Sequence, residues 1–141
     1  MDQLELISVL NRLLGVLCRS LPRYLEEAKP FSSRDNQQLI ETLDQITTDQ
    51  RLFASRVADA ILHHGGRPSP GRFPSEFAAA NDLSLDFLLE RLIEYQHHDV
   101  EAIECCAADL ADVAPMRLLA EEAMNNAKEH STILKEMTKH E

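Results

Sequence analysis

Four segments of the chain each place one polar residue near the middle of an otherwise apolar helical stripe. These residues are Ser20, with Leu17 as the alternative position, and then Gln50, Gln96 and His130. Inward carboxylates and histidines from facing helices hold metal ions in the interior of some helical bundles. Neutral amides and a histidine can instead hydrogen-bond to one another and fix how the helices align. The residue types therefore leave two interpretations, a metal site or a structural polar layer.

His130 has the most versatile side chain of this set. We predict that it is a buried, neutral histidine that hydrogen-bonds to Gln50, Gln96 or a water molecule. The alternative is a metal ligand, and then Glu122, at the edge of the same stripe, is the best nearby carboxylate. The expected buried polar layer consists of Gln50, Gln96, Asn126 and His130. No catalytic residue is expected, and His130 and Glu122 are the only candidate metal ligands.

Two further groups of polar residues are candidates. Glu94 and His97 have the spacing of a ligand pair, but they lie about 100–160° around the helix from Gln96 and should face solvent. Asp99 lies at the edge of the inner arc and could meet Asn126 across antiparallel helices. We interpret that contact as a satisfied polar pair and not as a site.

Apolar residues recur at three- and four-residue steps in four segments, which predicts four amphipathic helices. The segments run from about 4 to 28, from about 33 to 64, from 82 or 84 to about 110, and from 115 to about 137. Pro22 lies inside the first pattern, so we expect a kink there or a break into two pieces. Gly65 and Gly66 are a strong stop signal for the second segment, and Pro115 is a favoured first-turn residue for the fourth.

The stretch from Gly65 to Asp82 contains three prolines and three glycines, which exclude a long regular element. Its about 18 residues could reach about 55–60 Å when extended, whereas a helix of about 30 residues spans about 45 Å. The stretch can therefore return along the whole length of the helices, which would leave the second and third segments parallel. Phe73 and Phe77 could pack on the helices as the chain passes, with part of 75–80 forming a short helical turn.

The charge of the chain limits its partners. Acidic residues outnumber basic ones by 24 to 14, which gives a net charge of −10, and the pI is near 5.0. Such a surface repels nucleic acid and anionic lipid, so we expect neither a nucleic-acid nor a membrane partner. Arg67 and Arg72, in the stretch before residue 82, could bind an anion, although no phosphate-loop pattern is present.

The cysteines and the first residues bear on the compartment. Cys18, Cys105 and Cys106 are odd in number and two are adjacent, so they do not suggest a disulfide framework. Reduced thiols are typical of cytosolic proteins. The first residues lack the basic region of a signal peptide, and no apolar run reaches the about 20 residues that span a bilayer. We therefore expect a cytoplasmic protein.

With these features the chain resembles the ferritin-like superfamily. The resemblance covers about Leu4 to Met137 and depends on four long helices, a short first connection, a long second one and inward polar residues near mid-helix. The sequences Ile-Leu-His-His-Gly-Gly-Arg-Pro at 61–68 and Leu-Leu-Glu-Arg-Leu-Ile at 88–93 are similar to stretches of uncharacterised bacterial ferritin-like proteins. The resemblance implies an all-α protein, with one domain over residues 1–141. It would be a four-helix bundle with a long crossover between helices two and three.

The family's di-iron site would take a carboxylate from the first and third helices and Glu-x-x-His from the second and fourth. The matching positions here are Leu17 to Ser20, Gln50 with Phe53, Gln96, and Ala127 with His130. Only His130 is a ligand of the family type. Two hard metal ions need several anionic oxygens, so this set should not hold a di-iron centre.

The sequence therefore favours a ferritin-like bundle without catalysis or cofactor, acting as a structural or interaction module. We expect it to self-associate as a homodimer, because several apolar residues fall outside the helical stripes. These residues are Leu14, Val16, Leu25, Leu62 and Leu88. The alternative is an iron-dependent oxidoreductase or iron-handling protein with a non-standard ligand set, which His130 and Glu122 favour.

Overall fold

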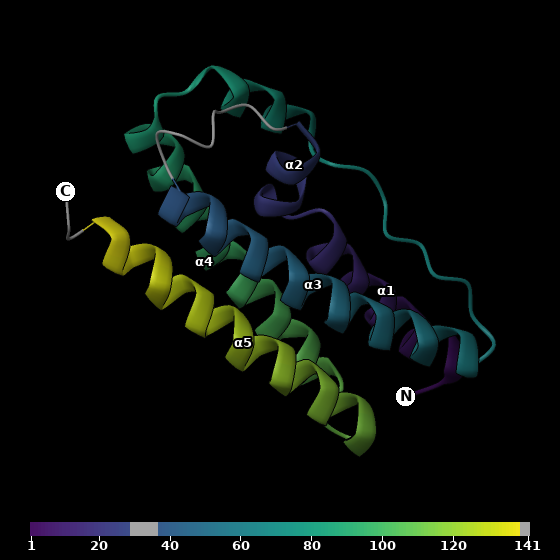
Figure 1. The fold of residues 1–141 in the computed structure, drawn as a ribbon. Helices are drawn as coiled ribbons and strands as arrows, with labels where there is room; N and C mark the ends of the chain where they lie inside the picture. Colours follow the sequence, from purple (N-terminus) through teal and green to yellow (C-terminus); the bar gives the residue numbers. More distant parts are fainter. Residues whose placement is uncertain (29–36, 139–141) are drawn as a thin grey trace.

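The computed structural model describes residues 1–28 and 37–138, and every regular element in these ranges is helical. The elements are α1 (Gln3–Cys18), α2 (Leu21–Ala28), α3 (Gln37–His63), the 3₁₀ helix η1 (Ser75–Asp82), α4 (Leu85–Asp109) and α5 (Ala114–Thr138), shown in Figure 1. The all-α prediction is confirmed for this part of the chain. Ser84 precedes α4 and Pro115 lies in the first turn of α5, as the sequence predicts.

The first predicted segment breaks between Cys18 and Leu21, where α1 ends and α2 begins. Ser20 lies in the break and caps α2, because its Oγ accepts a hydrogen bond from the Arg23 backbone N–H at 3.3 Å. Pro22 is the second residue of α2, where its missing N–H removes no helical hydrogen bond. The predicted break at Pro22 is confirmed.

The end of α3 follows from its two glycines. Gly65 takes a φ of 82°, a left-handed conformation that glycine adopts without strain. The N–H of Gly65 bonds to the Leu62 carbonyl at 3.0 Å, and the N–H of Gly66 bonds to the Ile61 carbonyl at 2.9 Å. This pair of bonds is a Schellman motif, which closes the helix. The predicted start of this segment near Ser33 lies outside the described residues.

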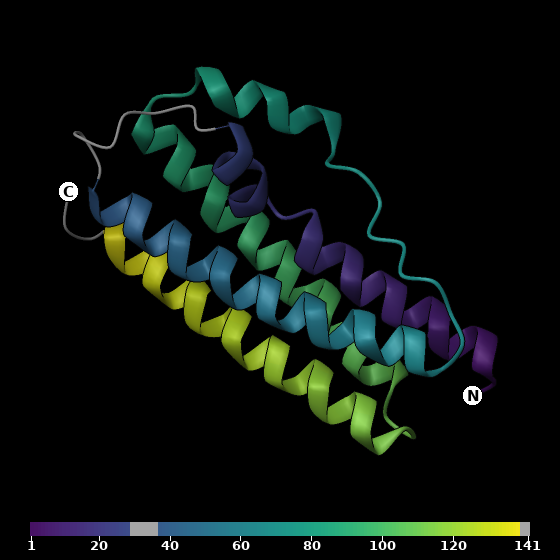
Figure 2. The same cartoon turned by 45° about the vertical axis from the view of Figure 1, so that its right-hand side comes forward.

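The connection between α3 and α4 returns along α1 to the other end of the helices (Figure 1, Figure 2). At its start, the Gln3 side-chain amide donates to the His64 carbonyl. Further along, Asn11 donates to the Arg67 carbonyl at 3.2 Å and accepts from the Ser69 N–H at 2.7 Å. As a result α3 and α4 run in one direction, while α1 and α5 run in the opposite one (Figure 2).

The later part of the connection packs on α2 and α4 through aromatic rings. The ring of Tyr24 lies 5.6 Å from that of Phe73 and 5.8 Å from that of Phe77, between centroids. Phe77, in η1, is buried and meets Tyr95 edge-on at 5.1 Å. The expected packing of both phenylalanines is confirmed, and the short helical turn expected within 75–80 is part of η1.

The apolar core consists of two clusters that follow one another along the helix axes. One cluster joins α1 to the second halves of α3 and α4 and the first half of α5. The other joins α2 and η1 to the opposite halves of the same three helices. Between the clusters lie Ser20, Gln50, Gln96 and His130, four of the six buried polar residues in the described ranges. We call these four residues the central layer. Asn126, which was also expected in the buried polar layer, is only partly buried, so the prediction is wrong for this residue.

Three of the five apolar residues expected on the surface are buried. Leu14, Leu25 and Leu88 are at most 3% exposed, so the expectation is wrong for them. Leu25 and Leu88 share an apolar cluster with Phe77 and Ala80 of η1, and Leu14 lines a pocket together with Pro68 and Pro70 of the connection, so all three lie close to the segment between α3 and α4. Val16 is partly buried, and Leu62 is 59% exposed as expected.

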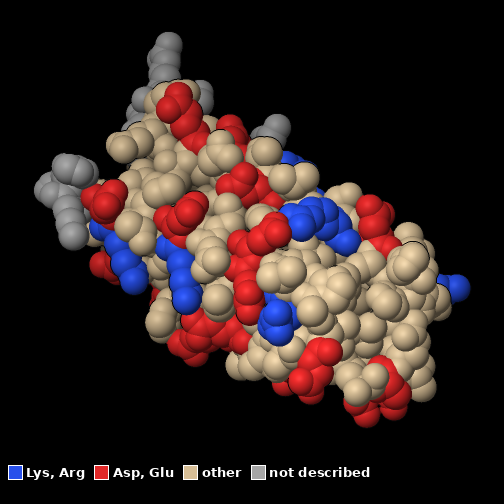
Figure 3. Space-filling model, turned by 90° about the horizontal axis from the view of Figure 1, so that it is seen from below, with Lys and Arg blue, Asp and Glu red and all other residues tan. Residues whose placement is uncertain are grey.

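Exposed apolar side chains gather mainly at the two ends of the helices. Leu4, Leu62 and Leu118 are more than half exposed at the end where α1 and α5 begin, and Phe87 and Ile133 are exposed toward the opposite end. Figure 3 shows a broad uncharged area on its right-hand side, toward the first of these ends. Among the described residues, the helices are all too short or too polar to cross a membrane.

Candidate functional site

Ser20 links the first two helices to α3 within the central layer. Its Oγ donates to Gln50 Oε1 at 2.8 Å while it accepts the capping bond from the Arg23 N–H. Both Ser20 and Gln50 are buried. A hydroxyl suits this position because it can donate one hydrogen bond and accept another at the same time. Leu17, the alternative position, belongs to the apolar cluster instead.

Gln96 links α4 to α5. Its Nε2 donates to the backbone carbonyl of Ala127 at 3.0 Å, and the small Ala127 side chain leaves that backbone accessible. Gln96 is 2% exposed, and its Oε1 has no hydrogen-bond partner among the described residues. A buried acceptor without a donor lowers stability, so this amide is only half satisfied by its neighbours.

His130 bonds to Asp49, which links α5 to α3. His130 Nε2 lies 2.8 Å from Asp49 Oδ2, and Asn126 Nδ2 donates to the same oxygen at 3.0 Å. Gln45 Nε2 donates to the other oxygen, Oδ1, at 2.9 Å. The two residues on each helix are four apart, so each pair lies on one helix face. This contact takes the place of the expected bond from His130 to a glutamine of the central layer.

Asp49 is ionised within this contact. Burial disfavours its charged form, but hydrogen bonds from Asn126 and His130 outweigh burial and lower the pKa of the Asp49 carboxyl. An ionised carboxylate can only accept hydrogen bonds, so Nε2 of His130 carries the hydrogen. Because the folded pKa lies below the unfolded one, the contact stabilises the fold above about pH 4. That stabilisation is lost as the pH falls through the folded pKa.

The candidate ligands Glu122 and His130 bind different partners. Glu122 pairs with Arg56 at 2.7 Å, and its side chain is 55% exposed. The hydrogen bond and the positive charge of Arg56 lower the pKa of Glu122. His130 instead faces Asp49 in the interior. The structure therefore does not bring the two candidates together as a ligand pair.

The other polar candidates from the sequence also have separate partners. Glu94 and His97 both face solvent, as expected. His97 lies 2.7 Å from Glu101 of its own helix, and Glu94 pairs with an arginine one turn earlier. The expected contact between Asp99 and Asn126 is wrong, because Asn126 projects toward α3 and binds the carboxylate there.

The Asp99 carboxyl, on α4, is perturbed by its burial. Burial raises the pKa of Asp99 to about 7, although the positive charge of Arg19 opposes this. Within the described residues, no ion pair or hydrogen bond of Asp99 offsets the burial. Asp99 therefore titrates near neutral pH, while Asp49 remains charged there.

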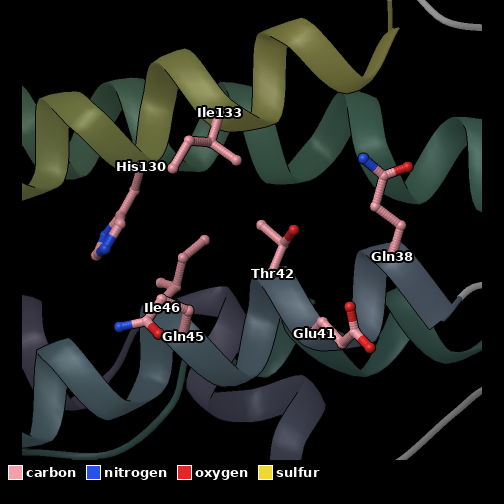
Figure 4. A pocket seen from close by; sticks show the side chains of 7 residues that line it. All are labelled: Gln38, Glu41, Thr42, Gln45, Ile46, His130 and Ile133. Atoms are coloured by element: carbon pink, nitrogen blue, oxygen red, sulfur yellow. The ribbon is translucent and has the colours of Figure 1, made fainter.

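His130 also lines a pocket of about 220 Å³ between α3 and α5. Figure 4 shows His130 and Ile133 projecting from α5 toward Thr42 and Ile46 of α3. The two helices that flank the pocket, α3 and α5, pack less closely than α4 and α5 do. Glu41 is the one carboxylate among the described lining residues, together with His130 and side chains that are apolar, amide or hydroxyl groups.

The central layer does not fit a di-iron centre. Gln50 is bonded to Ser20, Gln96 is bonded to a backbone carbonyl, and Phe53 is an apolar ring in the core. Only His130 has a side chain of the kind that the resemblance assigns to a ligand. In the described part of the chain, no group of three or more His, Cys, Asp or Glu side chains is arranged to hold a metal ion. Neutral amides do not supply the anionic oxygens that two hard ions require.

Asp49 is the residue of this site that the sequence did not single out. It lies one position from Gln50, at the edge of the apolar stripe of α3. The available signal was a pair of polar residues four apart on each of two helices, Gln45 with Asp49 and Asn126 with His130. That signal becomes informative only when α3 and α5 are known to face each other.

Comparisons with known proteins do not identify a family for the chain. No family model matches it, and no curated protein or solved structure matches it. The ferritin-like resemblance therefore stays a prediction. Within the site, three separate polar links join Ser20, between α1 and α2, to α3, α5 to α3, and α4 to α5.

Proposed function

We propose that the protein is a non-catalytic structural or interaction module, built as a ferritin-like four-helix bundle that self-associates. In this proposal α1 and α2 together form the first helix of the bundle, and residues 64–84 form the crossover. The shared direction of α3 and α4 supports the topology, since a single long crossover produces that arrangement (Figure 2).

The non-catalytic role is supported by the hydrogen bonds that polar side chains of the interior make with one another. Asp49 accepts hydrogen bonds from three side chains, and Gln50 accepts one from Ser20. Groups that satisfy each other across helices fix which faces meet, because any other register would leave them buried without partners. A central layer of this kind supports alignment of the helices more directly than it supports a reaction.

Exposed leucines support self-association. Leu4, Leu62 and Leu118 lie at the end of the molecule where α1 and α5 begin and α3 stops. The uncharged area in Figure 3 extends toward the same end, so a second copy would meet little charge there. Two copies joined by the same surface form a closed, symmetric dimer, which is the commonest kind of small oligomer.

Light scattering coupled to size exclusion tests this proposal. We expect the protein to have a dimeric mass, and Leu62→Glu to shift it toward the monomer. Phe87→Glu is the matched control, because Phe87 is 61% exposed, close to the 59% of Leu62, but lies at the opposite end of the helices. Circular dichroism would show that both variants remain helical. A monomeric mass at high protein concentration, or equal effects of the two variants, would contradict self-association through this end.

A second candidate function is metal binding with a non-standard ligand set. The observation in its favour is the contact of His130 with Asp49, which joins one imidazole and one carboxylate beside a pocket. Metal analysis after aerobic addition of iron distinguishes the two candidates. Stoichiometric iron that disappears in His130→Ala would replace the structural role with metal binding.

A further inference from the structure

A second pocket, of about 350 Å³, lies where α1, α2 and α3 meet the connection. We call it the arginine pocket because Arg23 and Arg51 line it. Its volume is within the range of sites for small molecules. Much of the remaining lining is apolar, including Leu14, Pro68 and Pro70. Its described lining contains no Asp or Glu, in a chain where acidic residues outnumber basic ones by 24 to 14.

The wall that the connection contributes is held in place from α1. Asn11 bonds to the backbone of the connection on both sides of Pro68, through the Arg67 carbonyl and the Ser69 N–H. Proline fixes its own φ, so Pro68 and Pro70 add little freedom to this wall. The arginine pocket is therefore formed before any ligand binds, which reduces the entropic cost of binding.

Arg23 is the residue that indicates which class of ligand the pocket binds. Its Nη1 is buried and has no hydrogen-bond partner among the described residues. A guanidinium nitrogen in this condition has lost water without gaining an acceptor, which is unfavourable until an acceptor is supplied. Arg51, the second guanidinium, is paired with Glu26 and about half exposed. Together the two side chains leave an excess positive charge at the pocket.

Cys18 does not cancel this charge. Burial raises the pKa of the Cys18 thiol, although Arg23 and Arg19 oppose the shift, so the thiol is neutral at physiological pH. Cys18 lines the arginine pocket and is half-buried there. The pocket thus combines guanidinium donors with a neutral thiol and apolar walls.

We propose that the arginine pocket binds a small amphipathic oxyanion, whose carboxylate or phosphate group pairs with Arg23 and Arg51. The short apolar body of this ligand lies against Leu14, Pro68 and Pro70. Guanidinium groups bind both oxyanions through charge-assisted, often bidentate hydrogen bonds, so the two head groups share one chemistry. This proposal is independent of the self-association proposed above, because the residues involved lie elsewhere on the chain.

Titration of the ¹⁵N-labelled protein by NMR tests the proposal with four probes. These are hexanoate, hexyl phosphate, inorganic phosphate and hexanol, which separate the head group from the apolar body. We expect saturable shifts of the Ala54 and Ala58 amides, both in the pocket lining, with one or both hexyl anions. Inorganic phosphate should bind about tenfold more weakly than hexyl phosphate, and hexanol should not saturate. The stronger of the two anions identifies the preferred head group.

Arg23→Gln should weaken binding of the preferred anion by about tenfold or more. Arg56→Gln is the control, because Arg56 lies on α3, as Arg51 does, but pairs with Glu122 outside the pocket. Its effect should be below about twofold. Ala58→Leu fills the pocket without changing its charge and should also weaken binding, which provides a test if Arg23→Gln does not fold. No saturable shift with either anion would overturn the proposal, as would equal losses in Arg23→Gln and Arg56→Gln.

Discussion

Replacing Asp99 with asparagine should stabilise the protein at neutral and alkaline pH. Burial raises the pKa of the Asp99 carboxyl from 3.8 to about 7, so the folded protein retains a proton that the unfolded chain has released. Stability therefore falls as the pH rises between these two values, by about 1.4 kcal/mol for each pH unit. The full loss is about 4 kcal/mol above pH 7. Asparagine has nearly the same shape but no charge, so Asp99→Asn removes this loss.

The measured gain should be smaller than this upper value. Asp99 is only partly buried, and water at its exposed edge stabilises the carboxylate. We therefore expect Asp99→Asn to be about 1–3 kcal/mol more stable than the parent at about pH 8. The two proteins should be nearly equal at about pH 4, where the carboxyl is protonated in the folded state.

Urea unfolding followed by circular dichroism, at intervals between about pH 4 and pH 8, measures this difference. Subtracting the parent curve removes the other titrating groups, including Asp49, whose contribution has the opposite sign. Glu90→Gln is the control, because Glu90 is an exposed carboxylate on the same helix. It should give a small and nearly pH-independent change. A difference between Asp99→Asn and the parent that does not grow with pH would refute the argument.

Three further substitutions test two of the links between the helices and the end of α3. Ser20→Ala should lower the free energy of unfolding in urea by about 2–3 kcal/mol, because it removes the cap of α2 and leaves buried Gln50 without its donor. A loss below about 0.5 kcal/mol would contradict both roles of Ser20. His130→Ala should raise the pKa of Asp49, measured by NMR titration, and lower the free energy of unfolding by about 1.5–3 kcal/mol. An unchanged pKa of Asp49 would show that the contact does not form. Gly65→Ala should lower the free energy of unfolding by about 1–2 kcal/mol. The loss comes from backbone strain alone, since an added Cβ meets no atom within 4 Å. An unchanged unfolding midpoint would argue against the left-handed φ of Gly65.

The local features of the fold could be predicted because each depends on a few neighbouring residues. Pro22 is excluded from a helix interior but tolerated in a first turn, so a helix begins just before it, and Gly65 provides a left-handed residue for the end of α3. The inward direction of Gln50, Gln96 and His130 follows from helical periodicity, and all three are buried. These predictions needed no knowledge of which helices are neighbours.

The predictions that were wrong concern residues that contact segments distant in the sequence. Leu25 and Leu88 have surface positions by periodicity, yet both are buried in an apolar cluster that includes Phe77 and Ala80 of η1. We expected a contact between Asn126 and Asp99, but in the structure the Asn126 side chain donates a hydrogen bond to Asp49, on a different helix. A periodic pattern specifies the direction of a side chain relative to its own helix, and an irregular connection leaves no such pattern to show what it covers.

The sequence by itself determined the helical class of the described chain, the break before Pro22, the stop at Gly65 and the burial of one polar residue in each of the long helices α3, α4 and α5. Only the tertiary structure decided the partners of those polar residues, the pairing of His130 with Asp49 and the pKa of Asp99. It also decided that Arg23 and Arg51 share a pocket with the connection. The physical reason is that helical periodicity depends on backbone geometry within a few residues. Hydrogen-bond partners and desolvation depend on which helices and connections pack together.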